Sequence, residues 1–421
     1  MKGYESNGLE GRENKRTLKS KDKTGRYYQF GALAVAILMI SGMAIGTLVI
    51  TENGTYDTDM DNQYVNNLES DYVIWKDGSN YYAKNGTNGV INKDTNFTKI
   101  IQDCINELNE SGDGGLINIK KGVYSVTFPI YVKRNIHIKG AGYSWPSSND
   151  KGITILRLAN SANCTVIYLQ GTIGVDNFHL EDFLIDGNQG NQDGGGYGIY
   201  ADSYFKDGLI EHVNIEDCPQ DGMYFDGTSW GLVIDTCIIE HNGGDGLHVD
   251  SWAKVFGCKI NSNTGYGVYV DGGGCIFTNN EIGDNGKNGI FIGGGSIFTG
   301  NNLYGNDNSG SYFGQMFTSV GGSTIVGNRI DCNGDSRYGL HFWSTSQNNT
   351  VGDNIITEGT HGRILDQGKM NIINNVGKNA GNPNSEGVFY STGVGELGDI
   401  VFDTINDKYY SHNGTAWMIL N

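Results

Sequence analysis

Residues 221–271 read DGMYFDGTSWGLVIDTCIIEHNGGDGLHVDSWAKVFGCKINSNTGYGVYVD. One short pattern occurs three times in this stretch, as GMYFD, GLHVD and GVYVD: a Gly, an apolar residue, a Tyr or His, an apolar residue and an Asp. Apolar residues at every second position have the period of a β-strand. A strand pattern that returns after roughly 20–25 residues is typical of stacked coils. The repeated Asp could serve chemistry, or it could only mark turns of the fold.

The repeat extends far beyond these three copies. One apolar column recurs every 20 to 30 residues or so, and a second column lies two positions before it. The first column is Ile185, Ile215, Ile239, Ile260, Ile282, Leu303, Ile330, Ile356 and Val376. The second is Phe183, Val213, Cys237, Cys258, Asn280, Asn301, Asn328, Asn354 and Asn374. Helical solenoids have longer repeats and little Gly, and leucine-rich repeats need a leucine-dense consensus, so the pattern predicts an all-β parallel β-helix.

Each column has a physical role in such a coil. Like residues stack one coil apart, so the isoleucines bury their side chains in a continuous core. A stacked Asn can hydrogen-bond backbone groups and the next Asn, which makes its burial tolerable. Cys237 and Cys258 lie close enough for a disulfide, although small apolar filling is the simpler interpretation. Glycines at 222, 246, 267 and 289 are expected to take a positive φ or a tight corner.

Strand alternation predicts which residues face solvent. If the residue after each glycine points into the core, the next one points out. The expected outward column is Tyr200, Tyr224, His248, Tyr269, Phe291 and His341. The positions two residues further on, also expected outside, are Asp202, Asp226, Asp250, Asp271, Gly293, Trp343 and Asp366.

These two columns suggest a glycan-binding groove. Aromatic rings would give flat platforms for sugars, with Tyr200, Tyr224, Tyr269, Phe291, His341 and Trp343 as the predicted substrate-binding residues. Neighbouring carboxylates repel each other and recruit hard cations, so Asp226, Asp250 and Asp271 are predicted ligands of Ca²⁺. Asp226, His248 and Asp250 are the predicted catalytic residues, with His248 transferring protons.

A simpler interpretation stays open for the same residues. Asp at a strand end often forms a turn through its own side chain, and Tyr and Phe are good strand residues. On this view the aspartates only mark turns, as we expect for Asp221 and Asp245, and His248 is an ordinary surface histidine.

Residues 94–142, DTNFTKIIQDCINELNESGDGGLINIKKGVYSVTFPIYVKRNIHIKGAG, resemble the entry of pectate-lyase-superfamily right-handed β-helix proteins. The resemblance covers roughly residues 72–380 and implies a capping helix at FTKIIQDCINEL. LIDGN at 184–188 resembles an element of polygalacturonases, and HNGGDGLHVD at 241–250 resembles a repeat of mannuronan C5-epimerases. Neither catalytic set is present: the polygalacturonase GHG and RxK motifs are absent, and FDGTS at 225–229 replaces the epimerase DPHE.

The N-terminal segment predicts a membrane anchor. Residues 30–50, FGALAVAILMISGMAIGTLVI, form 21 uncharged residues, about the length that spans a bilayer. Basic residues precede the run and acidic residues follow it, so the N-terminus is expected in the cytoplasm and the rest outside the cell. A cleaved signal peptide or a prepilin-type leader are alternatives. The expected order is 1–26 basic tail, 27–50 transmembrane helix, 51–70 polar stalk, 71–93 β-hairpin module, 94–392 β-helix and 393–421 C-terminal β-hairpin module.

The composition and charge of the chain restrict the classes of molecule that it is expected to bind. The net charge of −18 argues against nucleic acid, whose phosphates need a basic surface. Polysaccharide is the predicted partner, bound and cleaved by lyase or hydrolase chemistry, with Ca²⁺ implied for a lyase. The alternative is a non-catalytic cell-surface or fibre protein that uses the coil as a spacer, with its C-terminal module as an oligomer contact. Sequons that permit glycosylation lie at Asn53, Asn85, Asn96, Asn109, Asn163, Asn348 and Asn413.

Overall fold

The computed structural model describes residues 70–374, apart from 144–151, 171–174, 228, 308–313, 333–337, 358, 361–362 and 370. It also describes the short segments 19–21, 27–29, 400–403, 408–412 and 417–420. Two compact units are separated near residue 67, and each is treated by itself. The predicted stalk at 51–70 and the hydrophobic run at 30–50 lie outside the described residues, except for Ser70. No helix in the described part of the chain is long and apolar enough to cross a membrane.

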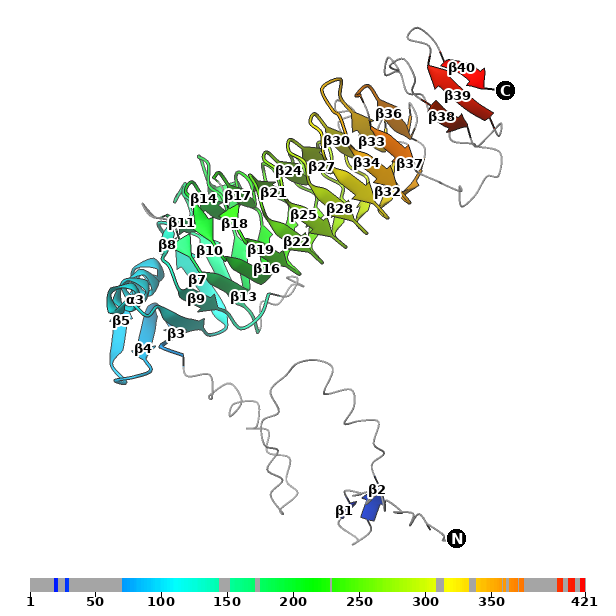
Figure 1. Cartoon of the computed structure of the whole chain (residues 1–421). Coiled ribbons are helices and arrows are strands. Elements are labelled where there is room, and N and C mark those ends of the chain that lie inside the picture. Colours follow the sequence, from blue (N-terminus) through cyan, green and yellow to red (C-terminus); the bar gives the residue numbers. More distant parts are fainter. Residues whose placement is uncertain are drawn as a thin grey trace, which may run out of the picture. The chain divides into compact units, whose positions relative to one another are not determined.

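The main unit is a coil of parallel strands, as the sequence predicts. In its middle, each turn contributes three short strands, and each strand pairs in parallel with the strand one turn later (Figure 1). The stacked strands therefore form three faces. Turns are 21 or 22 residues long in the centre and 26 or 27 residues further on.

The first face comprises β6 (Gly115–Ile119), β9 (Ile136–Lys139), the start of β13 (His179–Asp186), the start of β16 (Leu209–Glu216), β19 (Val233–Asp235), β22 (Lys254–Phe256), β25 (Ile276–Thr278), β28 (Ile297–Thr299), β31 (Thr324–Val326), β34 (Thr350–Gly352) and β37 (Ile372–Asn374). The second comprises β7 (Gly122–Val126), β10 (Thr154–Leu158), the ends of β13 and β16, β20 (Ile238–Glu240), β23 (Lys259–Asn261), β26 (Glu281–Gly283), β29 (Asn302–Tyr304), β32 (Arg329–Asp331) and β35 (Ile355–Ile356).

The third face is a separate parallel sheet with ten strands in the described residues. They are β8 (Ile130–Val132), β11 (Ile167–Leu169), β14 (Ile199–Ala201), β17 (Met223–Phe225), β21 (Leu247–Val249), β24 (Val268–Val270), β27 (Ile290–Ile292), β30 (Met316–Thr318), β33 (Leu340–Phe342) and β36 (Ile364–Asp366). Beside it lie β12 (Val175–Asp176), β15 (Phe205–Lys206) and β18 (Ser229–Trp230), which pair in parallel, and the 3₁₀-helix η1 (Gln189–Asn191).

The predicted apolar column forms the core. Its members from Ile185 to Ile356 pair in register from coil to coil, and each is at most 5% exposed. Val376 lies outside the described residues. Burial of this column removes apolar surface from water continuously along the coil, which is the main stabilising contribution in such a fold.

Two ladders of stacked, buried Asn residues lie at the turns that lead from one face to the next. Asn280, Asn301, Asn328 and Asn354 form the predicted ladder, with amide-to-amide hydrogen bonds of 2.9 Å. The predicted Asn374 does not belong to it, because that residue pairs with Gly352. A second ladder, which the sequence analysis missed, joins Asn242, Asn263, Asn285 and Asn306 at 2.8–3.0 Å.

The recurrent glycines have a steric cause. Gly222, Gly246, Gly267 and Gly289 do not have left-handed φ values. A Cβ atom at each would instead lie 2.5–2.6 Å from a side-chain atom of the neighbouring coil. The expected tight corner is therefore present, and positive φ is not the reason for these glycines.

Helix α3 (Phe97–Ser111) covers the start of the coil, as the resemblance implies (Figure 1). Asn96 caps it by accepting a hydrogen bond from the Lys99 backbone N–H, and Gly112 ends it at φ 86°. One face of α3 buries Phe97, Ile100, Ile101, Cys104, Ile105 and Leu108. Such caps shield an open apolar end from solvent.

The strands before α3 join the coil. β3 (Tyr72–Asp77) and β4 (Asn80–Asn85) form the expected hairpin, and β5 (Ile91–Asp94) adds a third antiparallel strand. β3 also pairs in parallel with β6, so the hairpin continues into the first face. Near the C-terminus, β38 (Ile400–Asp403), β39 (Lys408–His412) and β40 (Trp417–Leu420) form an antiparallel sheet. In the first unit, β1 (Lys19–Lys21) pairs with β2 (Tyr27–Gln29).

Candidate functional site

The outer side of the third face carries a column of stacked rings. The central residue of each strand points away from the core, because its two neighbours are buried. In order along the coil these residues are Tyr131, Tyr168, Tyr200, Tyr224, His248, Tyr269, Phe291, Phe317 and His341. We call this column the aromatic ladder. Its neighbouring ring centroids are 4.2–5.6 Å apart.

The ladder corrects the expectation of flat sugar platforms. Tyr269 and Phe291 stack at 4.6 Å with an interplanar angle of 5°, and His248 lies between Tyr224 and Tyr269. The stacked rings from His248 to Phe317 cover part of one another's faces, whereas the rings from Tyr131 to His248 are tilted by 32–51° to their neighbours. Each pair contributes about 0.5–1.5 kcal/mol beyond area burial, which makes the ladder a stabilising feature as well as a surface.

His341 was expected to face solvent but is only 1% exposed. Its ring lies among Phe317, Tyr338 and Trp343, and its Nε2 is 3.1 Å from Gln367 Oε1. Burial lowers the pKa of His341. Trp343 remains 40% exposed, so of this predicted binding pair only the Trp is available at the surface.

One coil further on, the predicted register is off by one residue. Leu365 pairs with His341 and so occupies the outward position, while Asp366 pairs with Phe342 and is buried. Asp366 Oδ1 accepts hydrogen bonds from the Gly368 backbone N–H and from Asn371 Nδ2, which compensate for its burial.

The predicted calcium ligands are not brought together. Asp202, Asp226 and Asp271 are exposed and Asp250 is half-buried, which confirms that this column faces outward. Among the described residues, two groups place three possible ligand atoms within 4.8 Å of one another, and Asp226, Asp250 and Asp271 belong to neither. Asp202 is engaged elsewhere, because it accepts a short hydrogen bond from the Tyr168 hydroxyl.

His248 instead lies beside the two aspartates assigned to turns. Asp221, Asp245 and His248 place a carboxylate oxygen each and an imidazole nitrogen within 4.8 Å of one another. Each of the two aspartates also binds the next coil: Asp221 Oδ1 accepts from the Asp245 backbone N–H at 2.6 Å, and Asp245 Oδ1 accepts from the Tyr266 N–H at 2.7 Å. These hydrogen bonds use one oxygen of each carboxylate.

The surroundings of this trio raise the pKa values of its two aspartates and lower the pKa of its histidine. Burial, and then the negative charge of Asp245, raise the pKa of Asp221 to about 7. Burial also raises the pKa of Asp245, against the effect of its hydrogen bond from Tyr266. Burial lowers the pKa of His248, although Asp271, Asp226 and Asp250 oppose the change. A protonated Asp next to a neutral His is a possible acid–base pair near pH 7.

Further aromatic residues line the same face. Tyr197 and Tyr266 pack beside the ladder, with centroids 4.8 and 5.4 Å from Tyr200 and Tyr269. Trp230 and Trp252 stack on each other at 5.8 Å, and each is 52% exposed. The analysis of the sequence missed these four residues, and also Tyr131, Tyr168 and Phe317.

The missed ladder positions have an identifiable cause. The columns were aligned on the glycine two residues before each outward residue, and Pro129, Val166 and Gln315 occupy that position before Tyr131, Tyr168 and Phe317. The triplet of apolar, aromatic and then apolar or Thr residues, present in IYV, IYL and MFT, would have found them.

The second face carries an acidic column that was also not predicted. Asp186, Glu216 and Glu240 pair in register on consecutive coils. Arg157 Nε lies 2.6 Å from Asp186 Oδ2. Burial and the neighbouring Asp186, Asp217 and Glu240 raise the pKa of Glu216 to about 7. These three carboxylates are not among the groups with ligand atoms within 4.8 Å.

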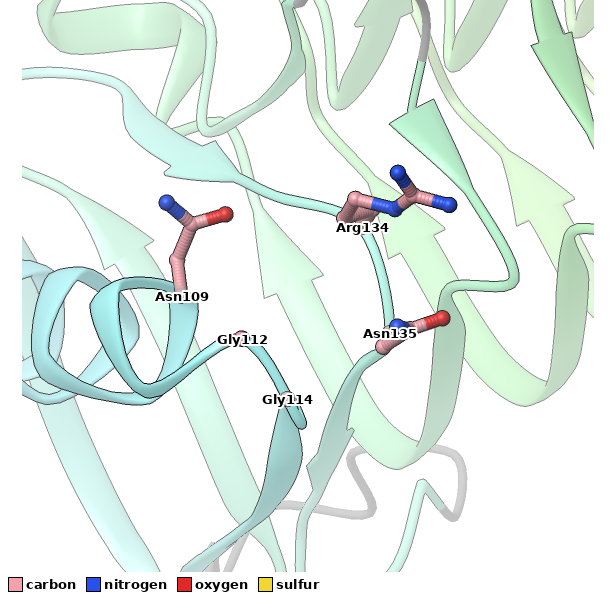
Figure 2. A pocket seen from close by; sticks show the side chains of 5 residues that line it. All are labelled: Asn109, Gly112, Gly114, Arg134 and Asn135. Atoms are coloured by element: carbon pink, nitrogen blue, oxygen red, sulfur yellow. The ribbon is translucent and has the colours of Figure 1, made fainter.

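An open depression of about 360 Å³ lies away from the ladder, at the C-terminal end of α3 (Figure 2). Asn109, Gly112, Gly114, Arg134 and Asn135 line it. Arg134 is its one ionisable side chain, so no acid–base pair is available there.

The family assignment rests on the repeated coil. A family model described as the right-handed β-helix region matches residues 136–274 and again 248–397, together more than half of the chain. The protein belongs to the right-handed β-helix family. The match covers the strands of all three faces from β9 to β37, and so includes most of the aromatic ladder.

Three solved structures illustrate what this chain is similar to. ORF18 of Geobacillus virus E2 is 16% identical, with a TM-score of 0.54, and the match covers 86% of this chain and 87% of that one. The A-module of a mannuronan C-5 epimerase from Azotobacter vinelandii is 16% identical, with a TM-score of 0.41 over 67% and 95% of the two chains. A DFA-IIIase from Arthrobacter chlorophenolicus A6, without its lid, is 11% identical, with a TM-score of 0.47 over 66% and 90%. No curated protein sequence matches this chain.

Proposed function

We propose that this protein binds a polysaccharide along the outer side of its third face and cleaves it at Asp221, Asp245 and His248. The observation that carries the proposal is the meeting of these three titratable groups in the middle of the aromatic ladder. The exposed Asp202, Asp226 and Asp271 and the half-buried tyrosines of the aromatic ladder lie on this face and recur from coil to coil. A linear polymer lying along the coil could make similar contacts on successive turns.

Within the trio, one residue can act as a general acid and another as a general base. Asp221, with its pKa raised to about 7, keeps a proton that it can donate at neutral pH. His248, with its pKa lowered, is neutral there and can accept one. Hydrolysis of a glycosidic bond and elimination by a lyase both need one donor and one acceptor. Ca²⁺ is expected only for the lyase route, where it would hold an acidic sugar against this acidic face.

The proposed setting is the cell surface. The uncharged residues 30–50, with basic residues before them and acidic residues after them, support a single-pass anchor with the coil outside the cell.

A second candidate is a non-catalytic surface or fibre protein. Two observations favour it: the ladder rings cover one another, and Asp221 and Asp245 each use one oxygen to bind the next coil. Both features would also stiffen a simple spacer.

The test uses the full-length chain on a panel of acidic and neutral polysaccharides, with Ca²⁺ and again with chelator. Chain shortening and unsaturated product are followed for the wild type, Asp221→Asn and His248→Ala. Asp77→Asn, which alters an exposed carboxylate at the end of β3, is the matched control. We expect shortening that the two site variants lose and the control keeps.

Loss in Asp226→Asn with full activity in Asp221→Asn would move the chemistry to the exposed aspartate column and overturn the proposed trio. Binding of a polysaccharide without shortening would leave the face as a lectin-like surface. Neither binding nor shortening of any polysaccharide would favour the spacer.

A further inference from the structure

A cluster of two His and two Glu lies on the first face, near the N-terminal end of the coil and away from the aromatic ladder. The residues come from three consecutive strands, β9, β13 and β16. His137 pairs with His179, and Glu181 pairs with Glu211, so like residues lie one coil apart. In the same column, Leu116 precedes the His pair and Leu209 follows it.

The side chains converge on one another. His137 Nε2 is 2.8 Å from Glu181 Oε1, and His179 Nε2 is 3.8 Å from Glu181 Oε2 and 2.8 Å from Glu211 Oε1. The imidazole rings stack with centroids 4.0 Å apart. The potential ligand atoms of His137, His179 and Glu181 all lie within 4.8 Å of one another.

We propose that His137, His179, Glu181 and Glu211 form a structural site for a transition metal ion of the zinc type. Two atoms bound tetrahedrally to Zn²⁺ at about 2.0–2.2 Å lie roughly 3.3 Å apart. The three nitrogen–oxygen distances above, 2.8, 2.8 and 3.8 Å, lie on both sides of that value. Glu211 lies outside the group of three whose ligand atoms are within 4.8 Å of one another and contacts it through His179, so binding by all four residues requires the Glu211 side chain to move toward the other three.

The ligand types select the metal. Two imidazole nitrogens and two carboxylate oxygens suit Zn²⁺ and its neighbours, whereas Ca²⁺ prefers oxygen ligands alone. The four side chains are 11–29% exposed, so the ion can reach them from solvent. Four protein ligands leave no open position, which is typical of a structural site and not of a catalytic one.

The surrounding charge permits a divalent cation. Lys139 Nζ lies 2.7 Å from Glu181 Oε1 and 3.1 Å from Asp182 Oδ2, and the carboxylate of Glu211 lies beside His179, so this group has three carboxylates and one ammonium. With both imidazoles neutral, this group carries a net charge of −2, because three negative charges face one positive charge. A Zn²⁺ ion would neutralise it and link three coils.

The first experiment measures Zn²⁺ binding to the full-length chain, without a polyhistidine tag, in competition with a chromogenic chelator. We expect His137→Ala and His179→Ala each to weaken one equivalent of binding at least about tenfold. His212→Ala is the matched control, since His212 lies on the same strand β16 near Asp182 but outside the cluster. His248→Ala separates this site from the trio on the third face. Both controls should keep the equivalent.

A second measurement does not depend on how well the variants fold. Co²⁺ bound to the wild type should show the absorption of a tetrahedral nitrogen–oxygen site, and Zn²⁺ should raise its Tm, because a ligand that binds only the folded state stabilises it. Absence of Zn²⁺ binding, an equivalent that persists in the His137→Ala/His179→Ala double variant, or a cobalt–thiolate band would each overturn the proposal. Because polysaccharide cleavage is not read in this experiment, its outcome is independent of the proposed function.

Discussion

Gly267 shows how a single hydrogen atom in place of a side chain permits the coil to close. A Cβ atom there would lie 2.6 Å from Asn285 Nδ2 and 2.7 Å from the Gly289 carbonyl oxygen. The carbonyl belongs to the backbone of the next coil and cannot turn away. We therefore expect Gly267→Ala to lower the free energy of unfolding by about 1–3 kcal/mol, the usual cost of overpacking. Denaturant unfolding followed by circular dichroism measures this.

The matched control is Gly190→Ala. Gly190 also lacks a left-handed φ, and nothing lies within 4 Å of the position its Cβ would take. We expect a change within about 0.5 kcal/mol, as for an ordinary surface substitution. Equal effects at both glycines would contradict the steric explanation.

The raised pKa of Asp221 predicts how the stability of the folded chain depends on pH. Its pKa is about 7 in the folded chain, whereas an unfolded Asp has a value near 3.9. Between these values the folded state binds more protons than the unfolded state, so stability falls as pH rises from about 4 to 7. Glu216 acts in the same direction, with a pKa also raised to about 7. Unfolding curves from pH 4 to 8 should show a smaller pH slope in Asp221→Asn than in the wild type.

The direct check is an NMR titration of the Asp221 carboxyl carbon. A midpoint near 4 would contradict the assigned environment and would remove Asp221 as a proton donor at neutral pH. The same titration of His248 should give a midpoint below the ordinary value of about 6.5, since burial lowers its pKa.

His341 and Asp366 are two residues whose burial was not predicted correctly from the alternation of side chains along a strand. Period-two patterning places His341 outside the core, but Trp343, Tyr338 and Phe317 pack around it. The alternation of side chains gives the direction in which His341 points, but it does not show that the bulky rings before it, after it and one coil away cover it. At Asp366 the error is one of register, and a slip of one residue exchanges inside and outside.

The Asn ladders make a prediction at the level of the element. Asn285 Oδ1 accepts hydrogen bonds from the Asn263 backbone N–H and from Asn263 Nδ2, and Asn285 Nδ2 donates to Asn306 Oδ1 and to the Ile260 carbonyl oxygen. Asn285→Ala leaves these buried groups unpaired. We expect a loss of about 3 kcal/mol in unfolding free energy, measured by denaturant titration.

Asn106→Ala is the control for this variant. Asn106 is exposed on α3 and accepts one hydrogen bond from Gln102. Its replacement should change stability by less than about 0.5 kcal/mol. A similarly small change for Asn285→Ala would mean that water replaces the lost amide.

One Asn ladder could be predicted from the sequence and the other could not, because the two ladders occupy different positions relative to the core residues of the strands. Asn280, Asn301, Asn328 and Asn354 each lie two positions before a core Ile or Leu, so the core column reveals them. Asn242, Asn263, Asn285 and Asn306 each lie three positions after such a residue, at the far side of the strand. Their spacing of 21 or 22 residues was the available signal.

At the scale of the whole molecule, stability does not rest on covalent cross-links. All seven cysteines lie in described residues and none of them forms a disulfide there, the adjacent Cys237 and Cys258 included. We expect unfolding curves with and without reductant to coincide, and seven thiols to titrate after unfolding. Burial raises the pKa of the Cys218 and Cys237 thiols, so they should react slowly in the native protein. Fewer than seven thiols under denaturing conditions would contradict this picture.

The architecture could be predicted because it repeats. The Ile column and the outward Tyr column each follow from a local pattern seen many times, whereas the capping helix followed from a family resemblance. The Asp221–Asp245–His248 trio could not be assembled in the same way. It depends on where the side chains of neighbouring coils lie relative to one another, and the pattern of a single coil does not show this.

The turn length of 21 or 22 residues in the centre of the coil has an evolutionary consequence. Each strand there pairs with the strand one turn before it and the strand one turn after it. Duplication of one such segment would insert a complete turn while every column of the core, the Asn ladders and the aromatic ladder stayed in phase. Descendants of this chain could thus lengthen or shorten the outer face by whole units through unequal recombination, without having to evolve a new core.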